Sequence, residues 1–268
     1  MKALLGDYPV TRLFKQESDL EFADVKVPNT AFKRVVRELE FDVAELAIMT
    51  FLLAKAHGKP YRLLPAVVTA RFQHSTLAYN PQRGPLSPDR LEGKKVGMRS
   101  YSVTTAAWVR GILADDYGVN LDKVNWVTFE DPHVAEFRDP PNVTRVAGTD
   151  LAAMLLSGEV DAAILAEPPR DGPLKPLIAD PAGAAEAWKK RTGASVQINH
   201  MVTVKNTVSK AQADDIYGRL KESREAAGNP PMNPFGVEEN RRNLEAAIEC
   251  VHKQRMIPRR FRLEELFE

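Results

Sequence analysis

A five-residue pattern occurs twice in the chain, each time between a helical segment and a short apolar run. Residues 40–44 read EFDVA and residues 159–163 read EVDAA. We interpret Asp42 and Asp161 as closing a tight turn from a helix to a strand, with chance similarity as the alternative. A true repeat predicts two similar α/β lobes, one before and one after about residue 90.

Short apolar runs and helical patterns alternate along the whole chain. Residues 30–39 carry apolar side chains at i, i+3, i+4 and i+7, and helices are also expected over 149–156, 209–227 and 238–254. This alternation predicts the α/β class with a largely parallel sheet. Ligands of open α/β sheets bind beyond the carboxyl ends of the strands, so two facing lobes would share one cleft.

A hydroxyl-rich loop is expected between a strand at 94–98 and a helix over 105–113. The first N–H groups of a helix lack partners and its dipole favours negative charge, so this junction is suited to an anion. The simpler alternative is that Ser102 or Thr104 only caps the helix. The candidate ligands of this loop are Arg99, Ser100, Tyr101, Ser102 and Thr104.

The net charge of +1 gives no electrostatic reason to expect a nucleic acid or a membrane surface as partner. The single Cys250 excludes an internal disulfide framework and a cysteine metal cluster. No apolar stretch approaches the roughly 20 residues of a membrane helix. The first residues lack the apolar core of a secretory signal, which favours the cytoplasm. A periplasmic protein whose leader has been removed would look the same.

Metal and cofactor motifs are missing from the sequence. The five histidines show neither HxH nor HExxH spacing, and there is no glycine-rich nucleotide loop. We therefore expect no metal and no organic cofactor. The ligand that the residues favour is a small carboxylate.

A series of blocks runs through the chain in one order: GDYPVTRLF, EFDVAELAIMTFLLAKAHG, RFQHSTLAYN, LEGKKVGMRSYSVTTAAWVRGILADDYGV, LLSGEVDAAI, INHMVTVKN, and NPFGVEENRRNLEA with the terminal LEELF. With these blocks the sequence resembles type 2 periplasmic binding proteins and, more narrowly, the 4,5-dihydroxyphthalate decarboxylase family. The resemblance implies two Rossmann-like lobes, joined by a two-strand hinge, with a ligand cleft between them.

The resemblance also implies an architecture in which one lobe is inserted into the other. The first lobe would comprise residues 1–92 and 203–268, and the second residues 93–196. The hinge strands would lie near 74–80 and 197–204. Members of the family are usually longer, and the segments between Glu130 and Thr149 and after Pro169 look short here. A shortened loop could change the activity.

Decarboxylation of a hydroxylated aromatic acid needs a general acid at the ring carbon that loses its carboxylate. By the resemblance, His74 and His200 lie close to the hinge, and Glu45 follows the first copy of the repeat. We take these three as catalytic candidates. The alternatives are that each histidine is structural and that Glu45 is only a negative charge at a helix N-terminus.

The reaction also needs cations or N–H dipoles that hold the carboxylates of the substrate. Arg71 and Arg99 are the preferred partners because a guanidinium matches a carboxylate with two parallel hydrogen bonds, and Arg12 is the third choice. Thr11 can donate a hydrogen bond. Glu167 follows the second copy of the repeat as Glu45 follows the first.

The sequence thus favours a cytoplasmic, cofactor-independent decarboxylase that acts on a small hydroxyaromatic dicarboxylic acid such as 4,5-dihydroxyphthalate. The alternative is a solute-binding protein of an ABC-type transporter, which closes on a small carboxylate without catalysis. A third is another reaction on the same fold, such as the dehydratase step of the alternative menaquinone route. Fold alone does not decide among these, and a homo-oligomer stays open.

Overall fold

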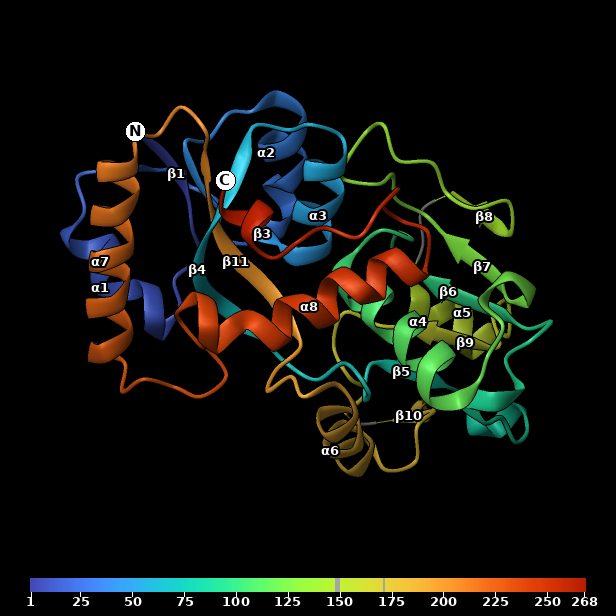
Figure 1. Ribbon diagram of the computed structural model, residues 1–268. Helices are drawn as coiled ribbons and strands as arrows, with labels where there is room; N and C mark the ends of the chain where they lie inside the picture. Colours follow the sequence, from blue (N-terminus) through green and yellow to red (C-terminus); the bar gives the residue numbers. More distant parts are fainter. Residues whose placement is uncertain (148–149, 171) are drawn as a thin grey trace. The chain divides into compact units, whose positions relative to one another are not determined.

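The computed structural model describes residues 1–147, 150–170 and 172–268, which form two compact units (Figure 1). Unit 1 comprises Met1–Arg71 and Ala194–Glu268, and unit 2 comprises Phe72–Gly193. The segment 72–92, expected in the first lobe, therefore belongs to unit 2. Its strand pairs within the sheet of that unit.

The sheet of unit 1 has the order β2-β1-β3-β11-β4. Its strands are β1 (Lys2–Leu4), β2 (Glu21–Phe22), β3 (Val43–Ala47), β4 (Tyr61–Ala70) and β11 (Ile198–Lys205). The first three are mutually parallel, and β11 runs antiparallel to both β3 and β4. The expectation of a largely parallel sheet is thus met only in part. The antiparallel insertion brings the start of β11 beside the carboxyl end of β3.

Five α-helices accompany this sheet in the described part of unit 1. They are α1 (Pro9–Glu17), α2 (Phe32–Glu38), α3 (Ile48–Ala56), α7 (Lys210–Ala226) and α8 (Val237–Lys253). The patterns over 30–39, 209–227 and 238–254 are thereby confirmed as helices. Helices α1 and α7 pack against each other (Figure 1), and their apolar residues, such as Phe14 and Leu220, share one core with strand residues.

The sheet of unit 2 has the order β10-β5-β9-β6-β7-β8. Its strands are β5 (Leu77–Tyr79), β6 (Lys95–Met98), β7 (Asn125–Thr128), β8 (Val143–Arg145), β9 (Ala162–Ile164) and β10 (Lys175–Pro176). Strands β6 to β9 are parallel, whereas β5 runs antiparallel to both of its neighbours, β9 and β10. The strands expected near 74–80 and 197–204 are thus β5 and β11, which lie in different sheets.

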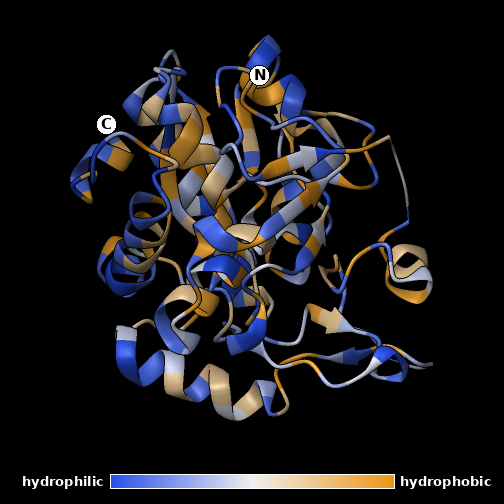
Figure 2. Cartoon of the chain, turned by 90° about the vertical axis from the view of Figure 1, so that its right-hand side faces the viewer, coloured by the Kyte–Doolittle hydropathy of each residue, from blue (hydrophilic) through white to orange (hydrophobic). Residues whose placement is uncertain are grey.

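The helices of unit 2 are α4 (Thr104–Tyr117), α5 (Leu151–Ser157) and α6 (Pro181–Thr192). The expected start of the helix at Thr149 lies outside the described residues. Hydrophilic and hydrophobic residues alternate along the helices in Figure 2, as expected where one side of a helix is buried. Among the described residues, no helix combines the length and the apolar character that a membrane span requires.

The repeated pattern forms the same pair of hydrogen bonds between two strands in both units, here called the joint. The Asp42 carboxylate accepts the Lys2 N–H at 2.9 Å, and the Asp42 N–H donates to the Lys2 carbonyl, also at 2.9 Å. Asp161 forms the same two bonds with Lys95, each 2.9 Å long. Each aspartate therefore ties the start of its own strand to the start of the parallel neighbour, β1 or β6.

Candidate functional site

A buried carboxylate meets a histidine where β3 and β11 lie side by side in unit 1. Glu45 of β3 is fully buried. Its Oε2 accepts the Gly6 N–H at 2.6 Å, and its Oε1 accepts the Tyr8 hydroxyl at 2.9 Å. His200 Nδ1 lies 2.8 Å from the same Oε1. The Glu45 side chain thus accepts hydrogen bonds from Gly6 and Tyr8, and its Oε1 can accept a third from the imidazole.

Strand register explains why these groups meet. Val202 of β11 lies opposite Glu45, and His200 lies opposite Ala47. Residues two apart on a strand share a face of the sheet, so His200 projects on the same side as Glu45. Strand β1 pairs with β3 through Leu4 and Ala44, which places the loop after β1 next to Glu45.

The His200 ring has one engaged and one available nitrogen. Its side chain is 17% exposed, and the Phe32 ring packs against it edge to face at 5.1 Å between centroids. Nε2 makes no hydrogen bond to any residue that the structure describes. In the tautomer that donates Nδ1–H to Glu45, Nε2 is the atom that can exchange a proton.

Thr11 joins this cluster indirectly. Its Oγ1 donates to the Gly6 carbonyl at 2.7 Å and accepts the Tyr8 N–H at 2.9 Å. Thr11 is fully buried at the start of α1. Its hydroxyl proton is therefore used inside the loop, where it fixes Gly6 and Tyr8.

Two residues of this cluster, Gly6 and Tyr8, were not among the candidates from the sequence. The only local signal for them is the turn GDYP directly after the first strand. From the sequence this turn is expected only to connect two elements, because nothing in it predicts a contact between Gly6 and Glu45, which are thirty-nine residues apart.

Unit 2 presents a second group of polar side chains at the carboxyl ends of β6 and β7. Ser100 and Thr128 are 1% and 0% exposed, and neither hydroxyl has a hydrogen-bond partner among the described residues. Helix α4 begins at Thr104 with Val103 as N-cap, without a side-chain capping bond. Ser102 and Thr104 are both buried near this end. Capping by Ser102 or Thr104, the simpler alternative, is therefore not what the structure has.

The Tyr101 side chain packs in the core of unit 2. Its ring stacks on Phe137, with centroids 6.5 Å apart, and the Arg110 guanidinium lies 3.5 Å above its centre. Arg110 Nη1 also donates to the Tyr101 carbonyl at 2.7 Å. Tyr101 is only 4% exposed and so anchors the loop from inside.

The cationic candidates are dispersed over the two units. Arg99 is 32% exposed, with Nε 3.6 Å from Glu130 Oε2. Arg12 forms an exposed pair with Asp7, 3.1 Å between Nε and Oδ1. Arg71 follows β4, where its N–H donates to the Gln197 carbonyl.

Glu167 does not occupy a position equivalent to that of Glu45. It is exposed in a bend after β9, whereas Glu45 lies within β3 and is buried. The parallel drawn from the repeat therefore extends to the two aspartates but not to these two glutamates.

His74 belongs to unit 2 and differs chemically from His200. It is 1% exposed, and neither ring nitrogen has a hydrogen-bond partner among the described residues. Burial lowers the pKa of His74 to about 4, while Asp116 raises this pKa and Arg191 lowers it by smaller amounts. The ring is neutral near pH 7 and has no acidic imidazolium proton to give.

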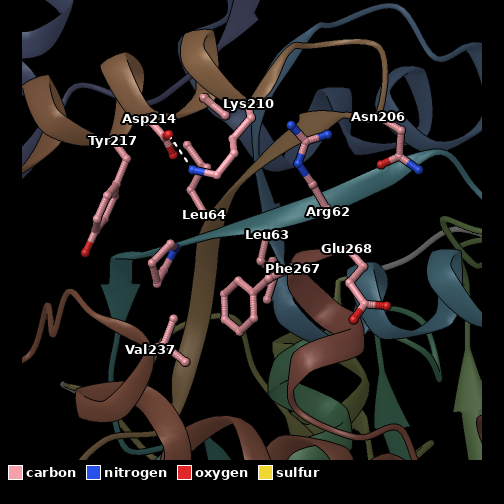
Figure 3. Close-up of a pocket in the computed structure, with 12 residues that line it drawn as sticks. Arg62, Leu63, Leu64, Asn206, Lys210, Asp214, Tyr217, Val237, Phe267 and Glu268 are labelled. Carbon is pink, nitrogen blue, oxygen red and sulfur yellow. Dashed lines mark hydrogen bonds and ion pairs between the residues drawn. The ribbon is translucent and has the colours of Figure 1, made fainter.

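A cavity of about 580 Å³ lies in unit 1, away from Glu45 and His200. Figure 3 shows Arg62 of β4 at its wall, with Lys210 paired to Asp214 at 2.6 Å. In the β4–β11 register Arg62 pairs with Val204, whereas His200 pairs with Thr69. Seven residues of strand separate Arg62 from Thr69, roughly 23 Å at ~3.3 Å per residue. The cavity is thus at the other end of the sheet.

Metal ligands do not cluster in the described part of the chain: no group of three or more His, Cys, Asp or Glu side chains is arranged to hold an ion. The chemistry that the cluster itself offers is proton transfer at His200 Nε2. The loop before α4 offers hydrogen-bond donors of a kind that suit an anion.

Two curated relatives share substantial sequence identity with the chain, although no protein-family model matches it. A 4,5-dihydroxyphthalate decarboxylase from Comamonas testosteroni is 32% identical over 196 residues, 68% of this chain and 59% of that protein. A 4,5-dihydroxyphthalate decarboxylase from Pseudomonas putida is 30% identical over 182 residues, 60% of this chain and 68% of that protein. The chain thus spans about three fifths to two thirds of the length of these relatives.

The fold also has counterparts among solved structures. The alkanesulfonate-binding protein SsuA from Xanthomonas axonopodis pv. citri matches with a TM-score of 0.55 at 14% identity, over 99% of this chain and 96% of that one. At this identity the likeness concerns the fold alone. The fold is that of the two-lobed type 2 periplasmic binding proteins, as the sequence resemblance predicted.

Proposed function

The chain belongs to the 4,5-dihydroxyphthalate decarboxylase family, and we therefore propose that it is a carboxy-lyase. The proposed substrate is a small hydroxylated aromatic dicarboxylic acid such as 4,5-dihydroxyphthalate, and the reaction needs no organic cofactor. One observation carries the proposal beyond family membership: a buried carboxylate holds a histidine by Nδ1 and leaves its Nε2 available.

In the proposed reaction His200 is the general acid. The hydroxyl para to the departing carboxylate donates electron density to the ring carbon that bears it. His200, protonated on both nitrogens, transfers its Nε2 proton to this carbon, and a C–H bond forms. The bond to the carboxylate then breaks, its electron pair stays in the ring, and carbon dioxide leaves. His200 recovers a proton from water, so each turnover consumes one proton.

Glu45 assists in this scheme without touching the substrate. An imidazolium next to a buried carboxylate is stabilised by their opposite charges, and the hydrogen bond fixes the ring orientation. His74 is not given this role, because its lowered pKa leaves it neutral near pH 7.

The loop at 99–105 is proposed as the carboxylate-binding element. Support comes from the N-terminus of α4, where Val103 makes no side-chain capping bond, from the buried Ser100 hydroxyl without a partner among the described residues, and from the partly exposed Arg99. Helix N–H groups and a guanidinium are the donors that a carboxylate prefers.

The test is an assay of carbon dioxide release by the purified protein from three matched acids. We expect turnover of 4,5-dihydroxyphthalate and slower turnover of 4-hydroxyphthalate, in which only one of the two carboxylates has a para hydroxyl. Phthalate has both carboxylates but no hydroxyl, so it should bind and raise the melting temperature without reacting. A chelator added in parallel checks whether a metal ion contributes.

Two variants make the assay specific to the proposed acid. His200→Gln should abolish measurable turnover but leave the thermal shift by phthalate intact. His252→Gln, at an exposed position in the last turn of α8, is the matched control and should behave like the wild type. Thermal shifts without any turnover of the three acids would contradict the lyase and favour the solute-binding alternative.

A further inference from the structure

Tyr8 and His200 hydrogen-bond to the same oxygen of the buried Glu45 carboxylate. The Tyr8 hydroxyl lies 2.9 Å from Oε1 and His200 Nδ1 lies 2.8 Å from it. A buried carboxylate stays ionised only if donors replace the water it has lost. When His200 carries a proton on each nitrogen, the loss of one donor to Glu45 favours transfer of the Nδ1 proton to the carboxylate, which leaves a neutral carboxyl group and a neutral imidazole with its proton on Nε2.

We propose that Tyr8 is a positioning residue, whose hydroxyl keeps Glu45 in its accepting form and thereby holds the His200 proton on Nδ1. His200 is then restricted to the tautomer in which Nε2 is the nitrogen that exchanges protons. The hydrogen-bond part of this proposal stands by itself, whereas its effect on turnover rests on the proposed function.

Tyr8 is suited to donating a hydrogen bond but not to transferring a proton. Burial, and then the negative charge of Glu45, raise the pKa of Tyr8 far above its usual value of 10. The phenol therefore keeps its proton near neutral pH. It is a permanent donor to Glu45.

The loop from Gly6 to Thr11 is built around this contact. A Cβ on Gly6 would lie 2.6 Å from the Tyr8 hydroxyl oxygen, so only glycine leaves room for the phenol there. Thr11 Oγ1 bonds both the Gly6 carbonyl and the Tyr8 N–H, which locks the two residues together. Gly6 in turn gives its own N–H to Glu45. The loop thus delivers two donors to one carboxylate.

The experiment compares the ring nitrogens of His200 in the wild type, Tyr8→Phe and Tyr61→Phe by nitrogen-15 NMR over a pH series. His200→Gln assigns the signal. Tyr61 is the matched control, because its hydroxyl also makes a buried bond, 2.7 Å to the Phe41 carbonyl, but does not contact Glu45. Circular dichroism confirms that each variant is folded.

We expect neutral His200 to carry its proton on Nδ1 in the wild type and in Tyr61→Phe, and to populate the Nε2–H tautomer in Tyr8→Phe. For turnover we expect kcat of Tyr8→Phe to fall about tenfold, the effect of one charge-assisted hydrogen bond, with KM nearly unchanged and an altered pH profile of kcat. Gly6→Ala, which displaces the phenol without removing it, should reproduce both changes.

The NMR result decides the inference without any turnover. An unchanged His200 tautomer in both Tyr8→Phe and Gly6→Ala overturns the positioning role. If either variant does not fold, the other still gives the comparison. A wild type that releases no carbon dioxide contradicts the proposed function only, since the tautomer of His200 is measured in the protein alone.

Discussion

His200 and Glu45 are 155 residues apart in the chain, yet Nδ1 of His200 lies 2.8 Å from Oε1 of Glu45. The contact depends on the register of β11 against β3, in which His200 lies opposite Ala47. A shift of the pairing by one residue would turn His200 to the other face of the sheet. Pairing between segments remote in the chain therefore makes the contact.

Glu45→Gln tests the charge at this contact. The amide keeps the shape of the side chain but loses the negative charge, and its NH₂ group faces donors where an acceptor is needed. We expect kcat to fall by about 10²-fold, the lower end for loss of general acid–base catalysis. The free energy of unfolding should drop by about 1–3 kcal/mol, because buried donors lose their acceptor.

Steady-state kinetics and denaturant unfolding measure the two effects. Glu167→Gln is the control, since this carboxylate is exposed in unit 2. A Glu45→Gln variant with wild-type kcat would show that the carboxylate does not assist His200.

Arg99→Ala tests the proposed carboxylate-binding element. The variant should weaken the binding of phthalate by at least ~1.5 kcal/mol, the lower end for a charge-assisted hydrogen bond. Titration calorimetry measures the affinity. Arg12→Ala is the control, because Arg12 is 57% exposed and already paired with Asp7. Equal affinities of the wild type and a folded Arg99→Ala would remove Arg99 from the site.

The lowered pKa of His74 leads us to expect a smaller free energy of unfolding in mild acid. Its pKa is lowered from 6.5 to about 4 in the folded protein, so the unfolded chain binds this proton more tightly. The contribution of neutral His74 is fully present above pH 6.5 and is lost as the pH falls from there towards 4. The shift corresponds to at most about 3 kcal/mol.

The measurement is the unfolding free energy of the wild type and His74→Gln between pH 7 and pH 4. The variant should lose less stability over this interval, because glutamine does not titrate. His57→Gln, at an exposed position after α3, should follow the wild type. Parallel curves for the wild type and His74→Gln would refute a buried, neutral His74.

The joint made by the repeat can be tested in each unit separately. Asp42→Ala and Asp161→Ala each remove a carboxylate that accepts a strand N–H, and we expect each to cost about 0.5–1.5 kcal/mol of unfolding free energy. The cost should be larger for Asp42, which is 31% exposed and pairs with Lys205, than for Asp161, which is 42% exposed and pairs with Lys94. Chemical denaturation measures both, and no loss in either variant would mean that the joint is not structural.

The amino-acid sequence alone was sufficient for features that depend on near neighbours. Apolar spacing predicted α7 and α8 within a residue or two of their ends, and the repeat predicted equivalent aspartates in two α/β units. The hydroxyl-rich loop between β6 and α4 was also visible. Each of these follows from periodicity or turn chemistry over a few residues, which the chain encodes locally.

Which of the candidate residues come into contact depends on long-range packing. In the folded chain Glu45 contacts His200, Gly6 and Tyr8. Glu167 is exposed, and Tyr101 is buried in the core of unit 2. Strand β11 takes its place between β3 and β4 because the apolar faces of three distant segments pack together. Such pairing reflects the burial of the whole core, and no window of neighbouring residues contains that information.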